Sequence, residues 1–362
     1  MNDAAHETLT YAFDRFPEEG EAIEVAEGIF WISLPVPFVG LRQVNIWLLR
    51  DGDGWTQIDT GHGDAPTQAL LRAIWNKLLG GRPVRRLILT HFHPDHAGNT
   101  RFVAEHWGGL LPRMAQGEWF AANRAIRNAY TDNIGDRSIF YRLHGLDPAL
   151  AGRFGREALL YSEGVRLTDS YRRVTDGETL RIGDDEWVAL RGDGHSPEHL
   201  SFYCAARNIL IAGDQVLPSI STNISVWPSE PEADPLGLFL ATCERFHHRL
   251  DPATFVLPSH RRPFHGVRPR LRELDLHHAA RLSVVLRAAA EPVSTGALLP
   301  IMFDRPLDGH QIGFAMGEAL AHVNYLTERG LLERLPVENG VQKFRRRPGA
   351  PDHVGPLFSN PA

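Results

Sequence analysis

The stretch Thr90-His91-Phe92-His93-Pro94-Asp95-His96-Ala97-Gly98 places three histidines and a carboxylate close together in the chain. It follows the run Val84–Leu89, whose Val, Leu and Ile residues predict a buried strand. The loop after such a strand is where α/β sheets usually hold their ligands. Imidazole and carboxylate groups suit zinc or another borderline divalent ion. Four such groups exceed what one tetrahedral ion with a free position for water can use. The stretch therefore predicts a two-metal site.

The alternative is that these histidines have no metal. A single histidine is more often a surface residue or a satisfied core residue than a ligand. Burying three imidazoles and a carboxylate together without an ion would, however, leave costly unpaired polar groups. The clustering therefore favours metal binding.

Further acids and histidines come directly after other expected strands. The pairs of strand and following residue are Trp55–Ile58 with Asp59, Glu186–Leu190 with His195, Ile209–Ala212 with Asp214, and Thr254–Leu257 with His260. Strand ends on one side of a sheet lie near one another, so these residues are further candidates for the same site.

This set of motifs resembles the metallo-β-lactamase-fold hydrolases. All five signature motifs are present in order across about residues 23–270. The resemblance implies an α+β fold, a four-layer αββα sandwich of two mixed sheets with helices outside. It also implies ligands for two metals: His91, His93 and His195 for the first, Asp95, His96 and His260 for the second, and Asp214 between both. Asp59 and Asp95 are the expected catalytic residues, Asp59 orienting the ligands and Asp95 orienting the nucleophile.

The function implied is that of a dinuclear metal-dependent hydrolase. A hydroxide bridging the two metals would attack a small carbonyl substrate, namely a thioester, ester, lactone or β-lactam. Zinc is the first choice of metal, with iron, manganese or cobalt as alternatives. A phosphodiesterase or endoribonuclease of the same fold is the alternative function. A binding module with structural metals is disfavoured, because structural zinc sites are closed by four protein ligands.

Two additions to a catalytic domain at residues 1–270 are expected. Residues from about 116 to 168 predict a helical insertion, which would be either a lid over the site or a packing element. Residues 271–349 resemble a winged-helix domain, and residues 350–362 form a tail. The C-terminal elements expected are helices at 271–290, 294–303 and 311–329 and a hairpin at 331–335 and 341–345, with Asn339-Gly340 at its turn.

The composition disfavours nucleic acid as a partner. The formal net charge is −6, and residues 271–349 contain ten Lys and Arg against nine Asp and Glu. Neither value gives the attraction for phosphates that nucleic-acid binding needs. The C-terminal region is therefore expected to brace the site or to form a homodimer interface.

The remaining sequence features indicate a small-molecule enzyme of the cytoplasm. The two cysteines, Cys204 and Cys243, imply no disulfide framework. No segment has the apolar length of a signal peptide or a membrane span, so no membrane contact is expected. A frayed N-terminal arm is expected as far as about Glu24. A strand is expected at Ile29–Leu34, followed by a break at Pro35-Val36-Pro37.

Four other histidines are expected outside the ligand set. His62 is a contact behind the metals, a substrate contact or a turn residue, and His199 is expected to bond to the backbone. His265 is not expected to be a ligand, and His278 is expected to lie partly in solvent on a helix.

Overall fold

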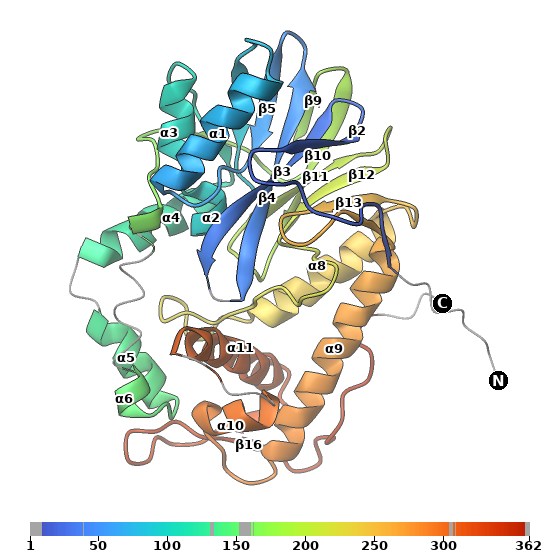
Figure 1. Cartoon of the computed structure of the whole chain (residues 1–362). Helices are drawn as coiled ribbons and strands as arrows, with labels where there is room; N and C mark the ends of the chain where they lie inside the picture. The colour runs from blue at the N-terminus through green and yellow to red at the C-terminus, as the bar shows by residue number, and fades with distance from the viewer. Residues whose placement is uncertain are drawn as a thin grey trace, which may run out of the picture.

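A computed structural model describes residues 9–38, 40–130, 134–151, 161, 163–303, 307 and 309–358. Within them, two mixed sheets pack face to face and helices cover their outer faces (Figure 1). The first sheet runs in the order β2 (Ala22–Ala26), β3 (Ile29–Phe38), β4 (Leu41–Asp51), β5 (Gly54–Ile58), β6 (Val84–Ile88), β7 (Arg113–Met114) and β8 (Arg172–Arg173). The second runs in the order β1 (Thr10–Tyr11), β14 (Phe264–His265), β13 (Phe255–Pro258), β12 (Ile209–Gly213), β11 (His199–Cys204), β10 (Asp185–Gly192) and β9 (Thr179–Ile182). The expected α+β sandwich is confirmed.

Successive side chains of a strand point to opposite faces of its sheet, so each strand contributes to a core on both sides. In β3, Trp31 faces the second sheet and joins an apolar core between the sheets, while Phe30 and Ile32 face outward. The outward residues pack with helices α1 (Ala65–Leu78) and α3 (Thr100–His106). On the other side, the second sheet is covered by α8 (Pro235–Arg249) and α9 (Val267–Ala288).

Parallel strand pairs direct their loops to one edge of the sandwich. β5 and β6 are parallel and joined through α1, which begins where Asp64 accepts a hydrogen bond from the Thr67 amide. β12 and β13 are parallel in the other sheet. The loops that follow these four strands carry most of the expected ligands.

Two sequence expectations about the first strands are wrong. Pro35 and Pro37 do not end β3, which continues to Phe38 with a shift of register against β4. The prolines are tolerated because β2 pairs only with residues 29–32 of β3, so beyond these residues no N–H is required on that side. The N-terminal arm is not frayed from residue 10 onward: β1 pairs with β14, and Phe13 and Phe16 pack against Trp31.

The expected insertion contains α4 (Gln116–Tyr130), α5 (Ile134–Leu143) and α6 (Pro148–Ala151). In Figure 1 these helices run down one side of the molecule from the first sheet to the C-terminal helices. The Gly296 amide donates to the His144 carbonyl at 2.8 Å, and the Gln342 amide donates to the Leu143 carbonyl at 2.7 Å. The middle of the insertion, where α5 ends, thus packs on the C-terminal region. Residues 131–133, 152–160 and 162 of this stretch lie outside the described residues.

The C-terminal region contains the elements expected from the sequence. They are α9, α10 (Thr295–Met302), α11 (Gly309–Glu328) and a hairpin of β15 (Leu332–Arg334) and β16 (Phe344–Arg346). The expected divide between residues 270 and 271 lies within α9, which is continuous there. Residues 304–306 and 308, and the end of the tail at 359–362, are outside the described residues. In the described part of the chain, no helix has the length and apolarity to cross a membrane.

Candidate metal centre

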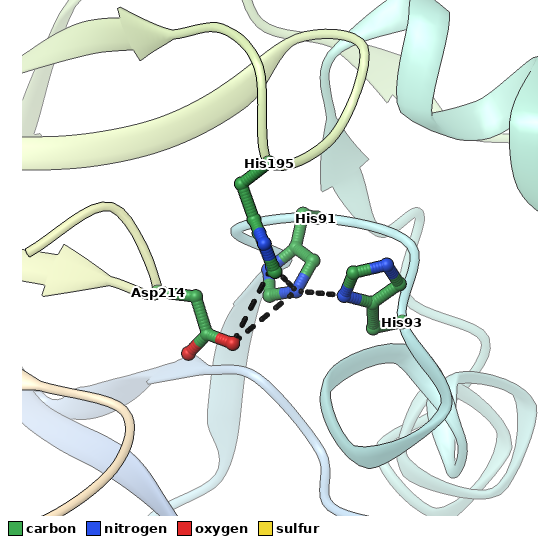
Figure 2. Close-up of side chains that lie close together, drawn as sticks. All are labelled: His91, His93, His195 and Asp214. Carbon is green, nitrogen blue, oxygen red and sulfur yellow. Dashed lines mark hydrogen bonds and ion pairs between the residues drawn. The ribbon is translucent and has the colours of Figure 1, made fainter. Parts of the chain in front are cut away.

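The loops at the sheet edge bring all seven expected ligands together. His91, His93, His195 and Asp214 form one group whose candidate ligand atoms lie within 4.8 Å of one another, and Figure 2 shows their side chains pointing toward each other. Asp95, His96 and His260 form a second group within the same limit. Sequence positions far apart in the chain therefore converge at one place.

Asp214 lies between the two groups. Its Oδ2 atom is 3.4 Å from His195 Nε2 and 3.9 Å from His91 Nε2. Its Oδ1 atom is 3.3 Å from His260 Nε2 and 3.6 Å from His96 Nε2. The two oxygens of one carboxylate thus face different groups, an arrangement that suits a bridging ligand.

The outer nitrogens of three histidine rings are fixed by acceptors. His195 Nδ1 donates to the Asn223 carbonyl at 2.7 Å, and His260 Nδ1 donates to the Gln43 carbonyl at 2.9 Å. His96 Nδ1 donates to the Asp59 carboxylate at 2.8 Å. Because a neutral imidazole carries one proton, the Nε2 atom of each ring presents a lone pair to the centre.

His91 is fixed in the same way through Thr90. The Thr90 hydroxyl donates to Asp59 Oδ2 at 2.8 Å and so accepts from His91 Nδ1, which lies 3.0 Å away. The Nε2 atom of His91 then carries a lone pair 3.3 Å from that of His195, and it lies 3.0 Å from His93 Nδ1. Lone pairs this close repel unless a cation lies between them.

These residues fit divalent cations. His96 Nε2 and Asp214 Oδ1 are buried and make no hydrogen bond, which is costly for polar atoms without another partner. Nitrogen and oxygen ligands bound at ~2.0–2.2 Å around one tetrahedral ion lie roughly 3.3–3.6 Å apart. Most of the separations between the converging atoms are close to that range.

The two groups differ in their electrostatics. Burial and the neighbouring His195 ring lower the pKa of His93 to about 3, and burial and the surrounding imidazoles also hold the pKa of His91 well below its ordinary value. Burial opposes the charged form of His96, but the carboxylates of Asp95, Asp214 and Asp59 outweigh it and raise the His96 pKa to about 9. A metal entering the second group must therefore displace a proton.

Asp59 is buried behind the ligands. Its Oδ1 atom accepts from the Thr90 amide at 2.8 Å, and its Oδ2 atom accepts from the Thr90 hydroxyl and from His96. The backbone φ of Asp59 is 63°, in the left-handed region that few residues other than glycine adopt. The strained turn directs the carboxylate at the Thr90 hydroxyl and at His96 Nδ1, so that Asp59 sets the tautomer of His96 directly and that of His91 through Thr90.

Glu118 supports the site and was missed by the sequence analysis. Its Oε2 atom accepts from the Phe92 amide at 2.9 Å, and its Oε1 atom accepts from the Ser196 hydroxyl at 2.7 Å and the Glu198 amide at 2.6 Å. Burial, opposed by these hydrogen bonds, raises the Glu118 pKa to about 7. The residue joins two ligand loops from the first turns of α4. No spacing in the sequence connects it with the histidine motif.

The four other histidines named from the sequence lie outside the two groups of expected ligands. His199 accepts from the Asp214 amide at 3.0 Å, so its expected bond to the backbone is confirmed. His62 pairs with Asp64 at the start of α1. His265 contacts the Ala253 carbonyl at an exposed position. The expectation for His278 is wrong: the residue is 1% exposed and packs against Phe239 and His322, because α9 is covered by α8 and α11.

The fold and the converging histidines and aspartates define a class of protein, and comparison of the sequence with known families agrees. The sequence matches the metallo-beta-lactamase superfamily over residues 39–272 and the metallo-beta-lactamase-like C-terminal domain over residues 282–347. The chain belongs to the metallo-beta-lactamase superfamily and is a metal-dependent hydrolase.

Two solved structures are similar along most of their length. A beta-lactamase domain protein from Burkholderia ambifaria is 40% identical with a TM-score of 0.86, over 94% of this chain and 98% of that one. A metallo-beta-lactamase family protein from Thermus thermophilus is 26% identical with a TM-score of 0.75, over 89% and 100% of the two chains. Human acyl-coenzyme A thioesterase MBLAC2 is 26% identical over 254 residues, which are 65% of this chain and 79% of that protein.

Proposed function

We propose that this chain is a dinuclear hydrolase that acts on a small carbonyl substrate, and that this substrate is a thioester. The observation that carries the proposal is Asp214, whose two oxygens face the two ligand groups separately. The seven proposed ligands are His91, His93, His195, Asp214, Asp95, His96 and His260. Zinc is the proposed metal, since nitrogen and oxygen ligands of this kind suit it well.

The chemistry assigned to each residue follows from its position. Two divalent ions held there would lower the pKa of a water molecule toward neutrality and polarise the carbonyl under attack. Burial of Asp95 is outweighed by His96 and His260, which lower its pKa to about 2. Asp95 is therefore ionised at neutral pH and is proposed to accept a hydrogen bond from the attacking water and orient it. Asp59 is proposed to orient His96.

The choice of a thioester is supported by the thioesterase named among the relatives. Carboxylic esters, lactones and β-lactams share the electrophilic carbonyl and are the other members of the proposed substrate class. Residues 271–349 are proposed to form a winged-helix-like unit with a structural role. Their near balance of charge gives little attraction for a phosphate backbone, which counts against a phosphodiesterase or ribonuclease.

A substrate screen of zinc-loaded protein tests the proposal. The panel contains an acyl-coenzyme A thioester, a carboxylic ester, a lactone, a β-lactam and a phosphodiester. We expect turnover of the thioester, and we expect it to fall to background in the double variant His91→Ala, His93→Ala. Thioester hydrolysis that survives in the double variant would disprove the metal mechanism, and activity on the phosphodiester alone would establish the alternative function.

A further inference from the structure

The segment between Asp214 and α8 connects the metal centre with the C-terminal helices. Thr222 Oγ1 donates to the Asp214 carbonyl at 2.7 Å, and the Asn223 carbonyl accepts from His195 Nδ1 at 2.7 Å. Residues 222–226, which we call the support loop, therefore touch two of the ligands of the first group. The loop fixes the backbone of Asp214 and the ring of His195.

The support loop is itself anchored in the C-terminal region. Its side chains Ile224 and Val226 are each 1% exposed and belong to the apolar core that contains Met316 and Leu320 of α11. The Val226 amide donates to the Gly317 carbonyl of α11 at 3.1 Å. Figure 1 shows α11 beside α8 and below the sheets that carry the metal centre. The loop is held by α11 and not by the sheets alone.

Gly317 is the point of closest approach. A Cβ atom at this position would lie 2.6 Å from both Ser225 Cβ and Ser225 Oγ, and 3.3 Å from Ser225 Cα. Contacts that short do not occur, so a larger residue in α11 would push the support loop away. The Ser225 hydroxyl also donates to Asn223 Oδ1 at 3.0 Å, which connects the contact point with the residue that holds His195.

A second C-terminal contact holds the same segment nearer to Asp214. Arg270 of α9 is 4% exposed, and its guanidinium donates to the Leu217 carbonyl at 2.6 Å and to the Ile220 carbonyl at 2.8 Å. The segment that carries Asp214 and the support loop is thus held by both α9 and α11.

From these contacts we propose that the C-terminal region sets the affinity of the first metal site, and that Gly317 is a positioning residue. Close packing of Gly317 on Ser225 holds the support loop, and the support loop holds the ring of His195 and the backbone of Asp214. Hydrogen bonds to the outer atoms of metal ligands commonly change metal affinity by about 10–100-fold. The inference rests on the proposed metal centre but concerns residues that contact no metal.

Metal titration of full-length Gly317→Ala tests the inference. Affinity is measured by competition between the protein and a chelating indicator for Zn²⁺, and ligand geometry by the absorption spectrum of the Co²⁺ form. Alanine favours a helix more than glycine does, so α11 itself is not weakened. We expect about 10–100-fold weaker binding of one ion and an altered Co²⁺ spectrum. Adding Ser225→Gly, which restores the space, is expected to recover most of the affinity.

A matched control separates positioning from general destabilisation. Asn324, also on α11, donates to the Pro231 and Ala233 carbonyls at 3.0 and 2.8 Å, in a segment with no ligand. Asn324→Ala is expected to lower the melting temperature and leave metal affinity and spectrum unchanged. Equal loss of affinity in Asn324→Ala, or unchanged affinity in folded Gly317→Ala, would overturn the inference.

A second variant tests the inference if Gly317→Ala does not fold. Thr222→Val keeps the shape of the side chain and removes its hydrogen bond to Asp214, so it is expected to weaken binding of the same ion. Wild-type affinity in Thr222→Val would overturn the inference when Gly317→Ala does not fold. If the wild-type protein binds no metal, the proposed function fails instead, which the same titration reveals before any variant is compared.

Discussion

At the scale of single residues, the site depends on the proton positions of its histidines. His96, His195 and His260 each donate their Nδ1 proton to an acceptor behind them, namely Asp59, the Asn223 carbonyl and the Gln43 carbonyl. The nitrogen facing the centre is therefore already free of its proton when the ring is neutral. Such acceptors also prevent the rings from rotating. The acceptors thus fix the orientation of each ring before any ion arrives, whereas His96, whose pKa is raised to about 9, must still lose its second proton when a metal binds.

Asp59→Asn tests whether the acceptor behind His91 and His96 determines metal affinity, at a residue that touches no metal. Asparagine tolerates the left-handed backbone conformation of Asp59, so the turn is expected to survive. Its amide cannot accept from Thr90 and His96 as the carboxylate does, and the tautomers of His91 and His96 lose their support. We expect about 10–100-fold weaker zinc binding in a chelator competition. Unchanged affinity would show that Asp59 does not orient the ligands.

The sequence predicted the proposed ligands and Asp59 behind them, but not the other groups that support the site. His91, His93, Asp95 and His96 are recognisable because their spacing is short and follows a strand. Glu118 and the Asn223 carbonyl are brought to the site by an inserted helix and by a loop packed on α11. Such contacts depend on tertiary packing, and a carbonyl has no side-chain identity that a sequence can reveal.

At the scale of elements, runs of apolar residues were sufficient to place the strands that precede the expected ligands, because such strands are buried on both faces. The sequence pattern failed where the neighbouring strand decides whether a segment forms a strand. β3 passes through Pro35 because β2 has already ended beside it, and β1 forms because β14 offers a free edge. Both facts belong to the pairing of the sheets and cannot be read from the short segments themselves.

The packing of α9 on α11 predicts a dependence of stability on pH. His322 Nδ1 donates to the Glu318 carbonyl at 2.8 Å, and His322 Nε2 lies 3.3 Å from His278 Nδ1. Burial lowers the His322 pKa from 6.5 to about 4, although the Glu318 carbonyl opposes the shift. The neutral ring is therefore favoured in the fold. The contribution of the neutral His322 ring to the free energy of unfolding is complete above pH 6.5 and is lost as the pH falls toward 4.

The loss of stability on protonation of His322 is measurable by urea unfolding. A change of about 2.5 pKa units corresponds to an upper limit of about 3 kcal/mol in the free energy of unfolding. We expect His322→Gln to flatten the decline in stability between pH 7 and pH 5. The exposed His265→Gln serves as the control and is expected to decline as the wild type does. An equally steep decline in His322→Gln would contradict the assignment.

At the scale of the whole molecule, removal of metal is expected to lower stability. The proposed ligands come from loops of both sheets, so ions bound there would connect the two halves of the sandwich. A ligand that binds only the folded state at a thousand times its dissociation constant adds about 4 kcal/mol to the free energy of unfolding. We expect the melting temperature to fall in chelator and to return with Zn²⁺. A melting temperature independent of zinc would contradict a site shared by the two sheets.

The strand formed by Thr10 and Tyr11 has a practical consequence for anyone producing this protein. It shields the outer margin of β14, and the aromatic rings that follow it shelter Trp31. Truncating the chain by about the first sixteen residues, as is often done for expression, would expose both the backbone hydrogen-bonding groups of β14 and the indole ring of Trp31. Exposed ladders of this kind invite pairing between molecules and precipitation. The opening residues are better retained, with any affinity tag placed ahead of them.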